Sequence, residues 1–117
     1  MAGDPPDLDT QSPDQAMLVL TTASSQEEAE RIAHLLVERR LAACVNLVPA
    51  VQSVYRWQGA VETASEILLV IKTVSSQLDA LEKTILANHS YQVPEFLALS
   101  VHSGSRPYLD WLSGSLR

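Results

Sequence analysis

The sequence has one cysteine, no long apolar run and no excess of basic residues, and each absence excludes a class of protein. Cys44 has no intrachain disulfide partner. Together with the absence of a secretory signal pattern, this indicates a reducing, cytoplasmic location. The apolar run Ile67–Ile71 is far shorter than the ~20 residues of a membrane helix. The formal net charge is −6, and outside residues 1–15 the acidic and basic residues nearly balance, which argues against nucleic acid and anionic membrane surfaces as partners.

Motifs of common catalytic sites are also missing. The chain has no glycine-rich phosphate loop, no nucleophile-elbow signature and no His–Cys pair at ligand spacing. Cys44 lies in LAACVNL without adjacent basic activators, which is typical of a small buried hydrophobic residue. We therefore expect that the protein is not an enzyme.

The acidic charge is concentrated at the start of the chain. Residues 1–15 contain four aspartates, no lysine or arginine, three of the six prolines and no aromatic residue. Such a segment buries too little apolar area to offset the entropy of ordering it. The sequence therefore predicts a disordered acidic tail over 1–15 and one domain over 16–117.

Apolar periodicity and turn residues predict the order of elements in the domain. The expected elements are a strand over 17–23, a helix over 24–40, a strand over 42–62 bent at Pro49, a strand over 65–73, a helix over 75–89 capped by Ser76, a strand over 95–103 and a helix over 105–116. The two central strands form a long hairpin around the QGA turn. This order predicts an α+β, ferredoxin-like β-α-β-β-α-β fold with a short C-terminal helix.

The strands MLVL, ILLVI and FLALSV are apolar at consecutive positions, so both faces of the sheet are apolar. Two amphipathic helices cover only one face. The other face needs a cover that one chain does not supply, which predicts self-association.

The stretch HSYQVPE, residues 89–95, carries the strongest candidate site. His89 and Glu95 are good ligands for a transition metal and could also act as acid or base. The alternative is structural, because Pro94 forces Val93 out of helical geometry and His89 lies near the end of a helix. Both interpretations stay open from the residues alone.

A second candidate site surrounds the apolar strand ILLVI, which Glu66 and Lys72 flank. These charges could simply keep the strand ends soluble. Alternatively, with Tyr55, Trp57 and Tyr91, they could form a polar cleft between subunits that holds a small anion or metabolite.

The segments LAACVNLVPAVQSVYRWQG, EILLVIKT, HSYQVPE and YLDWL resemble the signature segments of the CutA family of divalent-cation tolerance proteins. The resemblance runs from Met17 to Leu116. It implies a ferredoxin-like subunit in a tight homotrimer, related in architecture to the PII signalling proteins. It also implies a link to metal tolerance, with copper binding in some members and no established catalytic reaction.

The family pattern in the candidate site reads His-Pro-Tyr and then Pro-Glu. His89, Tyr91, Pro94 and Glu95 match it, whereas Ser90 replaces the first proline. In copper-binding relatives, a cysteine and a second histidine join the site.

Thr21 and Asn88 occupy those two positions here, so the soft donors that favour copper are missing. We expect a homotrimer linked to divalent metal (copper) tolerance, with weak metal binding and no obligatory cofactor. The alternative function is a PII-like sensor that binds a small ligand between subunits and signals to a partner protein.

Overall fold

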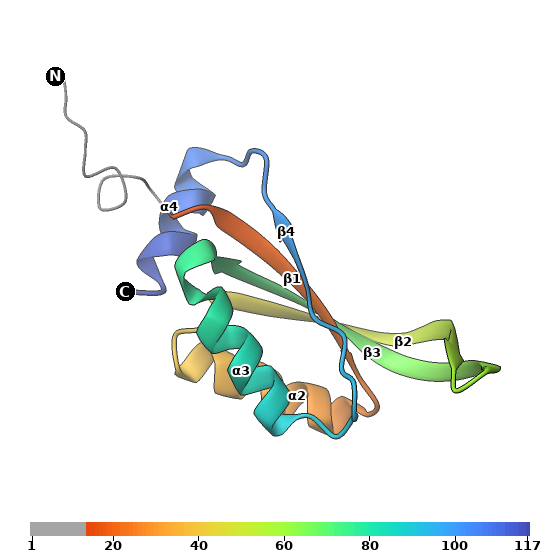
Figure 1. Cartoon of the computed structure of the whole chain (residues 1–117). Coiled ribbons are helices and arrows are strands. Elements are labelled where there is room, and N and C mark those ends of the chain that lie inside the picture. The colour runs from red at the N-terminus through yellow and green to blue at the C-terminus, as the bar shows by residue number, and fades with distance from the viewer. Residues whose placement is uncertain (1–13) are drawn as a thin grey trace, which may run out of the picture.

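The computed structural model describes residues 14–117 and confirms the α+β, ferredoxin-like fold (Figure 1). The elements are β1 (Ala16–Ala23), α2 (Gln26–Glu38), β2 (Cys44–Trp57), β3 (Ala60–Val74), the short 3₁₀ helix η1 (Ser75–Gln77), α3 (Leu78–Asn88), β4 (Leu97–Ser100) and α4 (Arg106–Gly114). The four strands form one sheet in the order β2-β3-β1-β4, and all neighbouring pairs are antiparallel.

Helices α2 and α3 pack against the same face of the sheet, as Figure 1 shows. Alternate residues of β1 and β3, including Val19, Leu69 and Ile71, are fully buried beneath them. The helices contribute Ile32, Leu36, Leu81 and Ile85 at helical spacing. This packing determines which face of the sheet α2 and α3 cover.

A serine side chain caps the start of α2, whereas α3 starts without a side-chain cap. Ser25 caps α2, since its Oγ accepts a hydrogen bond from the Glu28 N–H at 3.1 Å. In α3 the N-cap is Gln77, without a side-chain cap bond. Ser76 instead donates its hydroxyl to Asp14 Oδ2 at 2.7 Å. The prediction that Ser76 caps α3 was therefore wrong, because Ser76 lies within the 3₁₀ turn η1 and α3 begins only after Gln77.

Asp14 and Gln15, which the sequence places in the tail, are attached to the folded domain. The Gln15 carbonyl accepts the Ser75 N–H at 2.8 Å, and its side-chain amide donates to the Val101 carbonyl at 2.7 Å. The rest of the predicted tail, residues 1–13, lies outside the described residues.

The long hairpin of β2 and β3 projects from the body of the molecule (Figure 1). Its turn has Gln58 and Gly59 at φ 50° and 85°, the paired positive values of a type I′ turn. Closer to the body, β2 contains a bulge between Val48 and Val51, where Ala50 takes a φ of 61°. The predicted bend at Pro49 is therefore a β-bulge.

The face of the sheet that α2 and α3 leave uncovered is apolar, and we call it the open face. It carries Leu18, Leu20, Leu68, Val70, Leu97 and Leu99. The two residues from β4, Leu97 and Leu99, are 56% and 48% exposed. Helix α4 covers one end of the open face through Leu112 and Leu116, which pack on Val74.

Two further expectations are corrected by the fold. The strand expected over 95–103 is only Leu97–Ser100, because it pairs with just the first half of β1 at the sheet edge. Cys44 is only partly buried, since β2 is the other edge strand. Within residues 14–117, none of the helices combines the length and apolar composition that crossing a membrane requires.

Thr21 on β1 carries a buried hydroxyl without a hydrogen-bond partner among the described residues. Replacing Thr21 with valine should raise the free energy of unfolding by about 1 kcal/mol, because an unsatisfied buried polar atom is removed. Thr73 is the matched control. It is equally buried, but its hydroxyl donates to the Leu41 carbonyl at 2.7 Å, so Thr73→Val should destabilise the protein. Urea denaturation of both variants measures the contrast, and equal effects would contradict it.

Candidate functional site

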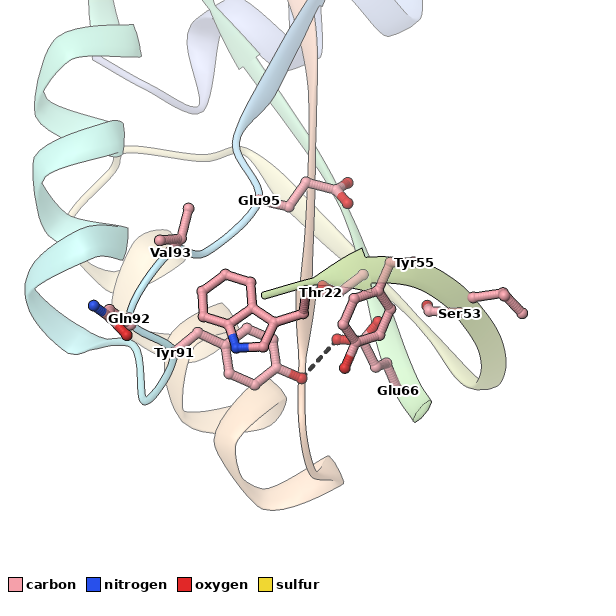
Figure 2. Close-up of a pocket in the computed structure, with 10 residues that line it drawn as sticks. Thr22, Ser53, Tyr55, Glu66, Tyr91, Gln92, Val93 and Glu95 are labelled. Atoms are coloured by element: carbon pink, nitrogen blue, oxygen red, sulfur yellow. Dashed lines mark hydrogen bonds between the residues drawn. The ribbon is translucent and has the colours of Figure 1, made fainter. Parts of the chain in front are cut away.

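A cleft of about 540 Å³ lies between the long hairpin and the segment that joins α3 to β4. Its walls come from four parts of the chain: β1 supplies Thr22, β2 supplies Tyr55 and Trp57, β3 supplies Glu66, and the segment between α3 and β4 supplies Tyr91 and Glu95. Figure 2 shows the Tyr91 ring beside Tyr55, with the Tyr91 hydroxyl directed at Glu66. The fold thus joins residues that are far apart in the sequence.

Glu66 is anchored in this cleft by hydroxyl groups. Its Oε2 accepts a 2.6 Å hydrogen bond from the Tyr91 hydroxyl, and the residue is only 8% exposed. Burial raises the pKa of Glu66, but hydrogen bonds from Ser53, Tyr91 and Thr22 outweigh it and leave the pKa below its usual value. Burial and the Glu66 carboxylate raise the pKa of Tyr91. At neutral pH the pair is therefore a carboxylate and a neutral phenol.

Glu95 adds a second acidic group to the cleft. Burial and then the negative charge of Glu66 raise the pKa of Glu95 above its usual value. Among the described residues that line the cleft, none is lysine or arginine. The cleft is therefore electronegative, and a bound cation would relieve the repulsion between the two carboxylates.

His89 has a fully buried side chain and both of its ring nitrogens are hydrogen bonded. Because a carbonyl can only accept, Nε2 carries the proton and donates it to the Thr22 carbonyl at 2.6 Å. Nδ1 accepts the Tyr91 N–H at 3.0 Å. In this geometry neither nitrogen offers a free lone pair to a metal, and His89 ties the end of α3 to β1.

The His89–Glu95 metal hypothesis stays a prediction. Glu95 lines the cleft, whereas His89 is absent from its lining. Within residues 14–117, no group of three or more His, Cys, Asp or Glu side chains is placed to hold a metal ion. A site built from this chain alone has few strong donors.

The same segment is anchored a second time by Glu28 on α2. Its carboxylate accepts hydrogen bonds from the Ser90 N–H at 2.8 Å and the Ser90 hydroxyl at 3.1 Å. Ser24 bonds the same carboxylate through its N–H and hydroxyl. This contact between α2 and the 89–95 segment was not predicted from the sequence. The signal was Ser90, because a serine at the family's proline position restores an N–H that needs an acceptor.

Lys72 is separate from the other predicted cleft residues. It lies six residues from Glu66 along β3, and its ammonium group contacts Asn46 and Cys44 on β2. The structure brings together Tyr55, Trp57, Glu66 and Tyr91, but Lys72 is not part of their cleft.

The two positions that carry copper donors in some relatives are also placed away from an open site. Thr21 is fully buried on the helix-covered face of β1. The Asn88 side chain donates to the Thr84 carbonyl at 2.8 Å within α3.

Comparison with known proteins gives a consistent assignment. The model of the CutA1 divalent ion tolerance protein family matches residues 17–115. The chain is 50% identical over 95 residues to a divalent-cation tolerance protein CutA from Thermus thermophilus, covering 81% of this chain and 92% of the relative. It is 46% identical over 102 residues to the chloroplastic CutA 1 of Oryza sativa, covering 87% of this chain. The chain spans 58% of the length of that rice relative and 56% of an Arabidopsis thaliana one.

Solved structures agree with the sequence comparison. The Thermus thermophilus divalent cation tolerance protein has a TM-score of 0.84 at 48% identity and covers 86% of this chain and 97% of its own. CutA1 from Oryza sativa has a TM-score of 0.86 at 45% identity and covers 89% and 95%. These matches confirm the family that the sequence segments indicate. The chain therefore belongs to the CutA1 divalent ion tolerance protein family.

Proposed function

We propose that this protein acts in divalent-cation tolerance as a homotrimer that binds a divalent cation weakly between Glu66 and Glu95. The observation that carries the proposal is the presence of two carboxyl groups in one cleft. The described residues that line this cleft include no lysine or arginine. The role is binding rather than catalytic turnover, and no cofactor is obligatory.

The chemistry of the donors supports weak binding. Carboxylate and hydroxyl oxygens suit hard cations such as Mg²⁺ and Mn²⁺, whereas copper prefers imidazole and thiolate. The nitrogens of His89 are occupied, and Thr21 provides no thiolate. We therefore expect copper to bind with a Kd of roughly micromolar or weaker.

Assembly into a homotrimer is supported by surface that one chain leaves exposed. The open face is apolar, and Val61 near the hairpin tip is 65% exposed. Burying such surface is favourable by about 25 cal/mol per Å². The hairpin projects from the body of the molecule (Figure 1), so its exposed side chains are available for contact with a neighbouring subunit.

A cytoplasmic location remains part of the proposal, supported by the single cysteine. By their names, the relatives include a chloroplastic protein of Oryza sativa and a periplasmic one of Archaeoglobus fulgidus. Location therefore varies among the relatives.

The cation proposal is tested by calorimetric titration with MnCl₂ and CuCl₂. Glu66→Gln and Glu95→Gln should each weaken Mn²⁺ binding about tenfold or more, because each removes a charged ligand. Glu62→Gln on the exposed part of β3 is the matched control and should bind like the parent. Binding should also weaken as the pH falls through the raised pKa of Glu95, since protons compete for the same oxygen.

The opposite pattern would favour the His89–Glu95 hypothesis instead. In that case Glu66→Gln would bind normally and His89→Ala would abolish binding.

The trimer is tested by multi-angle light scattering at micromolar concentration. The parent should have about three times the mass of one chain. The double variant Leu97→Asp/Leu99→Asp should shift toward the monomer, because two charges are placed on the open face. Leu86→Asp changes a residue of similar exposure on the outside of α3 and should leave the mass unchanged. A monomeric parent would rule out the trimer.

A PII-like sensor is the second candidate function, favoured by the size of the cleft. A volume of about 540 Å³ is large for a metal ion and is typical of a small-molecule site. In this role, the occupied cleft would change how the hairpin presents itself to a partner protein. The small anion considered from the sequence fits less well, because Lys72 lies outside the cleft.

A further inference from the structure

We propose that the cleft between the hairpin and the 89–95 segment binds a small organic ammonium ion. This deepens the proposed function, on which it rests for the use of the same cleft. The inference comes from a combination of aromatic rings and carboxylates that a metal-ion site does not need.

Three aromatic side chains line the cleft. Tyr55 and Trp57 project from β2 and remain 44% and 40% exposed, and Tyr91 lines the same cleft from the segment after α3. Tyr91 is held in place, because its hydroxyl donates to Glu66 (Figure 2) and its backbone N–H donates to His89. Exposed rings that face a cavity provide the negative π surfaces that attract alkylammonium groups.

The charges in the cleft select the sign of the ligand. Glu66 and Glu95 contribute two carboxyl groups, and the described lining residues include no lysine or arginine. These carboxyl groups would repel phosphates, nucleotides and carboxylate metabolites, and no basic side chain in the lining would offset the repulsion. A monovalent or divalent organic cation would be attracted by the same two groups.

The remaining lining residues suit the alkyl part of such a ligand. Val54 and Val93 are both 68% exposed and lie on the cleft wall. A hydrated metal ion gains little from contact with valine and tryptophan side chains, whereas the methyl or methylene groups of an alkylammonium ion bury apolar area against them. The aromatic, apolar and acidic groups of the cleft together therefore favour an alkylammonium ion as the ligand.

The test is a calorimetric titration of the full chain, in its native assembly, with choline chloride and with its uncharged isostere 3,3-dimethylbutan-1-ol. Choline should bind at least about tenfold more tightly than the isostere, because only choline carries the charge. Trp57→Leu should weaken choline binding about tenfold without changing the Mn²⁺ titration, and Trp57→Phe should restore much of the choline binding. Glu66→Gln should weaken both ligands.

Different outcomes separate this inference from the proposed function. Equal binding of choline and the isostere would show an apolar pocket and overturn the inference. Mn²⁺ binding without choline binding would overturn the inference and leave the metal proposal standing. Choline binding without Mn²⁺ binding would support the inference and reject the metal proposal. Light scattering and thermal melting of Trp57→Leu confirm that fold and assembly are intact.

Discussion

His89→Ala is expected to lower the free energy of unfolding by about 3 kcal/mol. The side chain is fully buried, and its two ring nitrogens bond the Thr22 carbonyl and the Tyr91 N–H. Removing the ring creates a cavity and leaves both backbone groups without their partner. The effect should be large even without a metal, because His89 connects the end of α3 to β1.

Urea denaturation of the parent and the variant measures this loss. His34→Ala is the matched control, since His34 lies on the exposed side of α2 and should cost less than about 0.5 kcal/mol. Equal stability of His89→Ala and the parent in metal-free buffer would contradict a structural role for His89.

Glu28→Ala is expected to lower the free energy of unfolding by about 2–3 kcal/mol. The carboxylate is almost completely buried and accepts hydrogen bonds from Ser24 and Ser90. Its loss leaves the Ser90 N–H unpaired and releases the segment that carries Tyr91. Glu27→Ala changes a neighbouring exposed glutamate in the same helical turn and is the control. Similar losses in the two variants would mean that only the charge near the helix start matters.

The contribution of Glu28 should also depend on pH. Burial raises its pKa, but the hydrogen bonds from Ser90 and Ser24 outweigh burial and hold the pKa below the ordinary value of 4.5. Glu28 then binds a proton more readily in the unfolded chain than in the folded chain. The stabilisation by Glu28 is therefore complete at pH values above its ordinary pKa. It is lost as the pH falls through the folded pKa. The stability gap between the parent and Glu28→Gln should therefore narrow between about pH 6 and about pH 3.

Local patterns in the sequence predicted the elements well because the forces that form them act over short separations. The Ser25 cap, the QGA turn and the alternation along β2 each depend on residues within a few positions of one another. The same patterns gave the chain order of the elements, and with it the ferredoxin-like fold.

Contacts between distant residues could not be predicted in this way. Glu28 and Ser90 are 62 positions apart, and Tyr91 and Glu66 are 25 apart. Lys72 was grouped with Glu66 because both flank one apolar run. Six residues of extended strand nevertheless span roughly 20 Å, which is too far for one small cleft. Closeness in the sequence of one strand therefore does not predict that two side chains belong to the same site.

The bulge in β2 shifts the pairing of β2 with β3 by one residue partway along the hairpin. Val48 pairs with Leu68 on one side of it and Val51 pairs with Glu66 on the other, so two residues of β2 stand opposite one residue of β3. Regular pairing through this point would place Tyr55 opposite Val61 instead of Glu62. Because facing side chains share a side of the sheet, the Tyr55 and Trp57 rings would then turn away from Glu66. One extra backbone residue, rather than any side chain, thus decides whether aromatic and acidic groups meet.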